Sequence, residues 1–159
     1  SLIHQIMIGR MKTDNKVIAS LFAADRLDHL LNETDGLVAK IEAGTTVISD
    51  RYYLSSYAYH SVDMPMEQVI AMNAPSRDML RPELHIFVDI DPDTAVARIA
   101  ANRQHTELFE KKSRLAKTRE CYMNVIKKLQ GEENIVIIDG TQSIEEIAEE
   151  VWLNVKKYF

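Results

Sequence analysis

The sequence is poor in the residues that cross-link a chain or let it turn sharply. Its 159 residues include one cysteine, five glycines, four prolines and one tryptophan. One cysteine excludes an internal disulfide and a cysteine-based zinc site, so Cys121, in a helical stretch, is expected to be a packed thiol. Each glycine stands alone, and no G-x-x-x-x-G-K-[ST] segment occurs. The sequence therefore contains no phosphate-binding loop of that kind.

Excess positive charge and long apolar segments are also absent. The formal net charge is −5, which argues against a general nucleic-acid or anionic-membrane surface. No apolar run approaches the roughly 20 residues of a membrane-spanning helix, and no charged-then-apolar leader opens the chain. We therefore expect a cytoplasmic protein. With 46% hydrophobic and 27% charged residues, residues 1–159 should form one globular domain.

Three short segments have the composition of buried β-strands. They are apolar or β-branched, are bounded by glycine or proline, and cover residues 45–49, 84–90 and 134–139. Helical patterns separate them, and connections of about thirty to forty residues are too long for hairpins. The pattern predicts an α/β fold with a parallel sheet flanked by helices.

Two helix starts are marked by their capping residues, whereas the beginning of the chain is unusual. Asp91 precedes Pro92, and Ser143 is followed three residues later by Glu146, as in a capping box. Residues 1–10 resemble the tail of an amphipathic helix with no strand before it. Three strands are also few for an α/β domain, where about five or six are usual. We therefore expect part of the fold to precede these residues.

Charged and hydroxyl side chains follow the first predicted strand, in "VISDRYYLSSYAYH" at residues 47–60. Ligands of open parallel sheets bind beyond the carboxyl ends of the strands, where helix N-termini favour anions. Asp50 falls at that edge and can hold a hydrated Mg²⁺, and Arg51 can bind a phosphate group bidentately. The alternative for these two residues is an ordinary salt bridge in a loop.

The helical pattern over residues 14–31 has two faces. The apolar stripe consists of Val17, Leu21, Ala24 and Leu31. Phe22, Arg26 and His29 lie on roughly the opposite face. A flat ring with an arginine one turn later can stack a planar base and donate hydrogen bonds to its carbonyl edge. The alternative is a second packing contact with an arginine that extends to solvent.

Four segments together resemble the thymidylate kinase family, which phosphorylates dTMP to dTDP with ATP and Mg²⁺. They are "LFAADR" (21–26), "DRYYLSSYAY" (50–59), "RPELHIFVDIDPDTAVAR" (81–98) and "IDGTQSIEEI" (138–147). Their order and spacing fit that family, and the likeness covers nearly the whole chain. The resemblance implies a three-layer P-loop kinase-like fold, a single nucleoside-monophosphate-kinase-like domain and a homodimer formed through helices, for which residues 14–31 or 66–74 could supply the surface.

The resemblance also implies roles for individual residues. Around the thymine base, it places the ring of Phe22 against the base, Arg26 at the thymine O4, and Ser56 at the thymine N3. Around the rest of the substrate it places Arg51 on the acceptor phosphate, Asp50 in the Mg²⁺ shell, through water, and Tyr59 against the deoxyribose. Packing roles are expected for Tyr52, Tyr53 and Tyr57.

A lid is expected at about residues 97–115, where kinases of this kind close basic side chains over the transferring phosphate. Arg98 and Arg103 are the candidates for the ATP phosphates, and Arg103 is the lid residue expected to act in catalysis with Asp50 and Arg51. Arg114 and Arg119 are expected to be solvated helix charges. Where the family usually has an arginine before the aromatic residue and glutamate of the lid, this sequence has Leu108.

The missing phosphate-binding loop and the unusual beginning have one explanation in the resemblance. In the family, a strand, the P-loop, a helix and a second strand precede the helix that "SLIHQIMI" resembles. We therefore expect that the sequence lacks the N-terminal portion and that the chain as given is inactive. Two alternatives are a related nucleotide or deoxynucleoside kinase and a non-catalytic nucleotide-binding or dimerising module.

Overall fold

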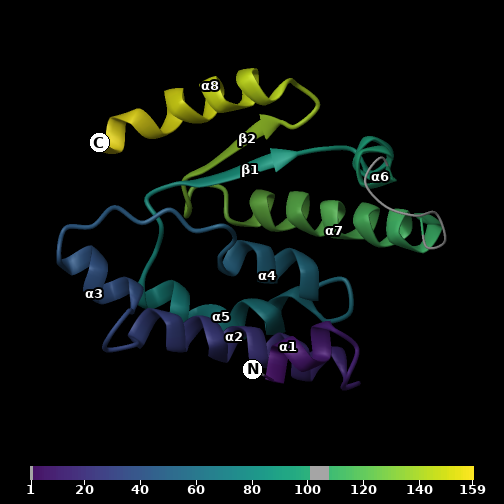
Figure 1. The fold of residues 1–159 in the computed structure, drawn as a ribbon, viewed down its shortest axis with the longest axis horizontal. Helices are drawn as coiled ribbons and strands as arrows, with labels where there is room; N and C mark the ends of the chain where they lie inside the picture. Colours follow the sequence, from purple (N-terminus) through teal and green to yellow (C-terminus); the bar gives the residue numbers. More distant parts are fainter. Residues whose placement is uncertain (1, 101–107) are drawn as a thin grey trace. The chain divides into compact units, whose positions relative to one another are not determined.

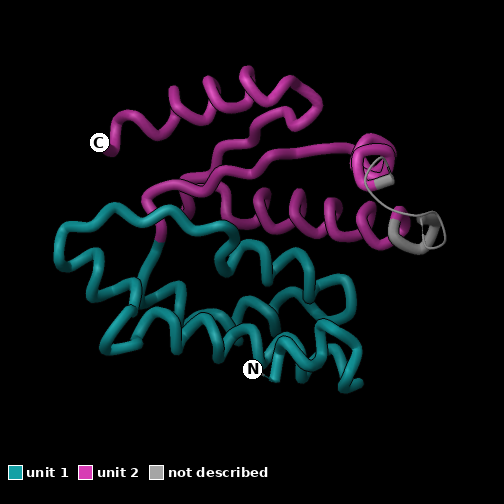
Figure 2. The backbone as a smooth tube through the Cα atoms, in the orientation of Figure 1, with its two compact units in different colours: residues 1–81 teal, residues 82–159 magenta. Residues whose placement is uncertain are grey.

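The computed structural model describes residues 2–100 and 108–159 and divides the chain into two compact units. Unit 1 comprises residues 1–81 and unit 2 comprises residues 82–159 (Figure 2). The described part of unit 1 is helical, whereas unit 2 contains a small parallel sheet with helices around it (Figure 1). The molecule is therefore a mostly helical α/β structure. No described helix combines the length and apolar character needed to cross a membrane.

Unit 1 packs its longer helices around buried aromatic and aliphatic side chains. Its helices are α1 (Leu2–Met7), α2 (Asn15–Leu31), α3 (Leu37–Glu42), α4 (Tyr53–His60) and α5 (Met66–Met79). Helices α2, α4 and α5 contact one another, and Leu30, Tyr53, Tyr57 and Val69 are at most 1% exposed. Burial of Tyr53 and Tyr57 agrees with the packing role expected for them.

Helix α2 begins as the sequence predicts but turns a different face to the core. Asp14 is its N-cap and accepts a hydrogen bond from the Lys16 amide at 2.8 Å. The predicted apolar stripe is wrong as a core face, because Val17 and Leu31 are 45% and 54% exposed. Ala19 and Leu30, which lie on the face of Phe22 and Arg26, are buried instead. An arginine belongs on this inward face because its polar partners are inside unit 1.

The predicted strand at residues 45–49 does not form. These residues have no strand assignment, and the Ile48 side chain is 88% exposed. Local composition can favour extended backbone, but a strand also needs a neighbouring strand to accept and donate its ladder hydrogen bonds. Residues 45–49 pair with no strand in the described part of the chain. This segment is therefore a loop that leads to Asp50 and Arg51.

Unit 2 is built on two parallel strands, β1 (His85–Asp89) and β2 (Ile135–Asp139). Both lie inside predicted strand segments, which confirms those two predictions and the parallel pairing. Around the strands are α6 (Pro92–Ala100), α7 (Leu108–Lys128), α8 (Ile144–Val155) and a short 3-10 helix η1 (Lys156–Tyr158). Just beyond β2, Gly140 donates a hydrogen bond to the Asp89 carbonyl at 2.6 Å. A Cβ at this position would lie 2.7 Å from the same oxygen.

The helix starts predicted in unit 2 are also confirmed. Ser143 caps α8 in a reciprocal capping box with Glu146, and the Asp91 carboxylate accepts a hydrogen bond from the Thr94 amide at 2.9 Å in the first turn of α6. The unit buries Val125, Leu129 and Ile138. Cys121 is half-buried, and burial raises the pKa of its thiol.

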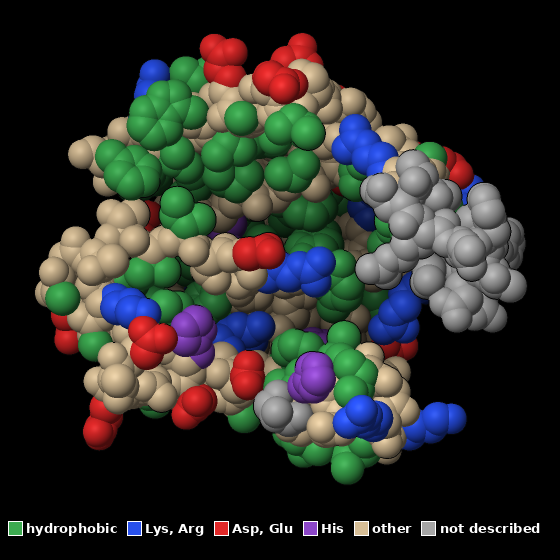
Figure 3. Space-filling model, viewed as in Figure 1, with side chains coloured by type: hydrophobic (Ala, Val, Ile, Leu, Met, Phe, Trp, Pro, Cys, Tyr) green, Lys and Arg blue, Asp and Glu red, His purple; other side chains and the backbone are tan. Residues whose placement is uncertain are grey.

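Apolar side chains gather over α8 on the face that Figure 3 shows. Trp152 is 55% exposed and Phe159 is 71% exposed. Their rings stack with centroids 6.2 Å apart. The tryptophan is thus fixed against a neighbouring ring while remaining open to solvent.

Candidate nucleotide site

A buried polar cluster surrounds the guanidinium of Arg26. From α2, Arg26 donates through Nη1 to Oδ1 of Asn73 on α5 at 2.5 Å, and through Nη2 to Oγ of Ser56 on α4 at 2.8 Å. Asn73 is 1% exposed and Ser56 is 5% exposed. Three helices thus converge on one arginine, and burial lowers the pKa of Arg26.

Tyr52 forms one wall of this cluster. The Arg26 guanidinium lies 5.7 Å from the centre of the Tyr52 ring, within the range of a cation–π contact. The Tyr52 hydroxyl lies 3.2 Å from the Ser76 carbonyl and 3.1 Å from the Leu80 carbonyl, both at the end of α5. Burial raises the pKa of Tyr52 to about 12. The phenol therefore stays protonated and can donate to these carbonyls at neutral pH.

Phe22 lies one turn before Arg26 on the same face of α2. Its ring is half-buried and contacts the His60 ring, with centroids 5.6 Å apart and planes inclined by 43°. The Phe22 ring thus contacts His60 while remaining partly exposed. The structure therefore places Phe22, Arg26 and Ser56, three of the predicted site residues, in unit 1.

Asp50 and Arg51 occupy the loop that leads into α4. Arg51 has a φ of 71°, a left-handed conformation that residues other than glycine rarely adopt. Ser49 Oγ donates to the Arg51 carbonyl at 2.8 Å, and the Arg51 guanidinium lies 4.9 Å from the centre of the Tyr59 ring. Strained backbone conformations of this kind concentrate at functional sites. The loop thus directs the exposed Arg51 onto Tyr59, another predicted site residue.

The acidic groups near this loop suit a metal ion that is mostly hydrated. Asp50 is exposed, and its carboxylate has no hydrogen-bond or ion-pair partner among the described residues. In that part of the chain, no three His, Cys, Asp or Glu residues cluster closely enough to bind a metal. Mg²⁺ commonly takes one or two carboxylates and completes its octahedron with water and phosphate oxygens. Asp50 fits this role as a single protein ligand.

The predicted lid residues belong to unit 2. Arg98 donates through Nη1 to the Gly140 carbonyl at 2.8 Å. Arg103 lies outside the described residues. The expectation that Arg119 is only a solvated charge is wrong, because its guanidinium forms two hydrogen bonds of 2.7 Å with the Asp89 carboxylate, which raise its pKa. Arg119 therefore ties α7 to the carboxyl end of β1.

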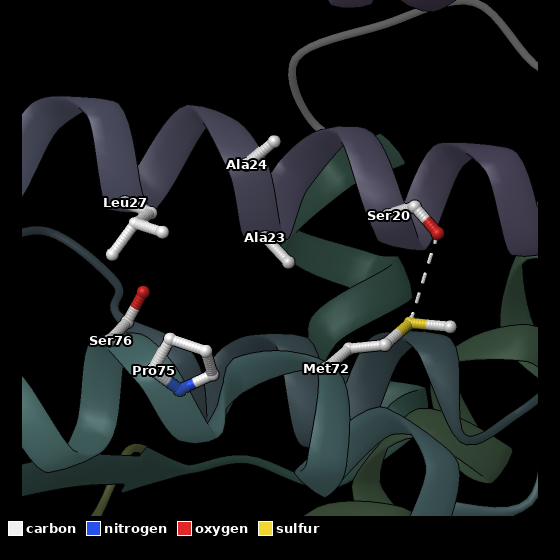
Figure 4. Close-up of a pocket in the computed structure, with 7 residues that line it drawn as sticks. All are labelled: Ser20, Ala23, Ala24, Leu27, Met72, Pro75 and Ser76. Carbon is white, nitrogen blue, oxygen red and sulfur yellow. Dashed lines mark hydrogen bonds between the residues drawn. The ribbon is translucent and has the colours of Figure 1, made fainter.

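A hollow of about 240 Å³ lies between α2 and α5 (Figure 4). Its lining consists of Ser20, Ala23, Ala24, Leu27, Met72, Pro75 and Ser76. Ser20 Oγ lies 3.9 Å from Met72 Sδ, and no charged side chain lines the space. A nucleotide needs polar partners for its base and a charged partner for its phosphate, so the Arg26 cluster together with Arg51 is a better candidate site than this hollow.

Asn73 joins the Arg26 cluster although no motif in the sequence points to it. Asn73 lies in "MEQVIAMNA", which shows an apolar pattern typical of a packed helix. An asparagine inside such a helix was the available signal, because its side chain competes with backbone hydrogen bonds and is unfavourable there without a partner.

The sequence model described as "Thymidylate kinase" matches residues 1–151. A probable thymidylate kinase of Methanocaldococcus jannaschii is 34% identical over 151 residues, which cover 94% of this chain and 72% of the relative. The thymidylate kinases of Ligilactobacillus salivarius and Geobacillus thermodenitrificans are 30% and 32% identical, with 86% and 93% of this chain covered and 66% and 67% of theirs. The chain thus spans about two thirds of the length of these curated relatives.

Proposed function

The chain belongs to the thymidylate kinase family, and on that premise we propose that the protein phosphorylates dTMP to dTDP with ATP and Mg²⁺ in dTTP synthesis. The observation that carries the proposal is the arginine cluster of unit 1, where Arg26 is held beside Ser56 and one turn from Phe22. A related kinase of another deoxynucleotide would need a different donor pattern at the base.

The cluster supports recognition of a thymine base. Phe22 offers a partly exposed ring for stacking, and Arg26 offers N–H donors to the carbonyl at C4. Ser56 carries a hydroxyl that can accept from the N–H at position 3 of the base. A cytosine presents an amino group at C4 in place of the carbonyl, so donors of Arg26 would oppose donors of the base.

The loop before α4 supports the binding of the acceptor phosphate. Arg51 presents a planar donor fork that matches two phosphate oxygens. Tyr59 lies under that guanidinium, and its ring is proposed to contact the sugar next to the phosphate. Asp50 would hold Mg²⁺ through water, and the ion would neutralise charge on the phosphates when bound.

Phosphoryl transfer requires positioning and charge rather than a covalent intermediate. Arg98 and Arg103 are proposed to contact the ATP phosphates from the lid. The fold of the whole kinase is proposed to be three-layered and P-loop kinase-like. The 159 residues contain no G-x-x-x-x-G-K-[ST] segment. We therefore expect this polypeptide to bind dTMP without turning over ATP.

We also propose a homodimer formed through helices. The exposed Val17 and Leu31 on α2 support this proposal.

Calorimetric titration of the chain with dTMP, dCMP, dUMP and thymidine tests the proposal. We expect dTMP to bind more tightly than dCMP, because of the C4 carbonyl, and more tightly than thymidine, because of its phosphate. Arg51→Ala should abolish the difference in affinity between dTMP and thymidine. It should leave the difference in affinity between dTMP and dCMP unchanged. A chain that prefers dCMP or thymidine would be a related kinase, and one that binds none of the four would refute the proposal.

A further inference from the structure

We propose that Asn73 is a positioning residue that orients Arg26 and thereby sets the preference of the site for a pyrimidine with a carbonyl at C4. The inference rests on the proposed function and deepens it. Its starting point is the contact between Asn73 on α5 and Arg26 on α2, two helices that lie against each other within unit 1 (Figure 1).

The amide of Asn73 has a fixed orientation. Its Nδ2 donates to the Val69 carbonyl, one turn earlier on α5, at 2.8 Å. Because the amide nitrogen is engaged there, the carbonyl oxygen Oδ1 must point the other way, towards Nη1 of Arg26. The side chain is 1% exposed, so water does not compete for either contact. Asn73 thus presents a buried acceptor in one direction only.

The two acceptors around Arg26 define the plane of its guanidinium. Asn73 accepts from Nη1 and Ser56 accepts from Nη2, so rotation of the guanidinium out of its plane would break one hydrogen bond or the other. The face of the group rests over Tyr52. A guanidinium has five N–H donors, and the other three donate to no described residue. The fixed plane therefore determines where the remaining donors point.

Orientation matters because Arg26 is the group proposed to read the base. Ser56 is proposed to contact the base itself, so on binding it must share its hydroxyl between Arg26 and the ligand. Asn73 does not share its acceptor with the ligand, since both ends of its amide are engaged inside the protein. Without Asn73, the guanidinium could rotate and accommodate an amino group at C4.

The experiment measures the ratio of dCMP to dTMP dissociation constants by calorimetry. Asn73→Leu keeps the volume but removes the acceptor, and we expect the ratio to fall roughly tenfold, the effect of losing one hydrogen bond to a charged group. Asn73→Asp keeps an acceptor and should preserve most of the ratio. Val69→Ala is the matched control, because it weakens the same buried helix face without touching Arg26.

A double-mutant cycle separates positioning from packing. In an Arg26→Ala background, Asn73→Leu should have no further effect on the ratio. Side-chain ¹⁵N spectra supply a readout that needs no nucleotide, because they report rotation of the Arg26 guanidinium. Rotation should be slow in the parent and Asn73→Asp chains and rapid in Asn73→Leu. Rapid rotation in the parent chain would overturn the inference even if Asn73→Leu failed to fold.

The outcomes also distinguish this inference from the proposed function. If the parent chain prefers dTMP and Asn73→Leu loses thermal stability but keeps the ratio, Asn73 only joins two helices and the inference fails alone. If Asn73→Asp loses the ratio as completely as Asn73→Leu, the acceptor role is likewise refuted. If the parent chain binds no pyrimidine nucleotide, the proposed function fails and the specificity role fails with it.

Discussion

At the scale of single residues, Arg51 shows how the loop before α4 holds the side chain that is proposed to contact the phosphate. Its left-handed backbone costs on the order of 1–3 kcal/mol, and the Ser49 hydroxyl and the Tyr59 ring offset part of this cost. The Ser49 contact holds the backbone of the loop, and the Tyr59 ring lies against the guanidinium. A phosphate that binds there is proposed to meet an arginine whose loop is already formed.

Phe22 should act through the face of its ring rather than through its volume. We expect Phe22→Ala to weaken dTMP binding by roughly 1–3 kcal/mol, the range measured for a base stacked on an aromatic side chain. Phe22→Leu retains an apolar group against His60 but offers no ring, so it should lose nearly as much affinity while keeping the stability of the parent. Titration calorimetry and thermal unfolding measure the two quantities. Lower stability with unchanged affinity would make Phe22 a core residue.

The predictions from sequence succeeded for residues whose local pattern carried the information. Phe22 and Arg26 share a face of α2 because of helical periodicity alone, whereas the contact of Arg26 with Ser56 comes from the packing of α2 against α4. Asn73 could not be found this way, because its partner is 47 residues away in the chain. Nor does a local pattern reveal the left-handed backbone of Arg51.

At the scale of secondary-structure elements, the capping box of α8 makes a measurable contribution. Ser143 Oγ accepts from the Glu146 amide at 3.3 Å, and the Glu146 carboxylate accepts from the Ser143 amide at 2.9 Å. We expect Ser143→Ala to lower the free energy of unfolding by about 1 kcal/mol, the usual effect of losing an N-cap. Ser143→Thr keeps a capping hydroxyl and should retain most of the free energy of unfolding of the parent chain. Urea denaturation followed by circular dichroism tests both, and equal midpoints for all three chains would contradict the expectation.

The first residue of β1 should make stability depend on pH. His85 is 8% exposed, and burial lowers its pKa below the usual 6.5 although Glu133, 3.5 Å away, raises it. The unfolded chain then binds a proton more readily than the folded chain, so stability should fall as the pH drops below 6.5. Urea midpoints between pH 7.5 and 5.5 measure the slope, which should weaken in His85→Asn. His29→Asn, which removes an exposed histidine of α2, is the matched control.

Elements were predictable where their signals are local. The caps of α6 and α8 and the segments of β1 and β2 carry their own signals in composition and sequence. The segment at 45–49 has the same composition but lacks a described neighbour, and pairing is not a local property. The inward face of α2 was misjudged for a related reason, since the polar partners that bury Arg26 come from α4 and α5.

At the scale of the whole molecule, the candidate groups divide between the two units. All residues proposed to contact dTMP lie in unit 1, and the described lid residue Arg98 lies in unit 2. A ligand stabilises the segments that bind it, by about 2.7 kcal/mol at one hundred times its dissociation constant. We expect dTMP to slow amide hydrogen exchange in α2, α4 and α5 far more than in β1, β2 and α8. Hydrogen exchange with mass spectrometry, with thymidine as the control ligand, tests this, and equal protection of both units would contradict it.

The stacked pair of Trp152, on α8, and Phe159 gives the protein an optical label. Trp152 is the sole tryptophan of the chain, and it lies in unit 2. Light at 295 nm, which tyrosine hardly absorbs, therefore excites a fluorophore that reports on residues 82–159, while four of the six tyrosines belong to residues 1–81. Because Trp152 is open to solvent beside Phe159, iodide should quench its emission. Selective excitation thus follows one half of the chain without any chemical dye.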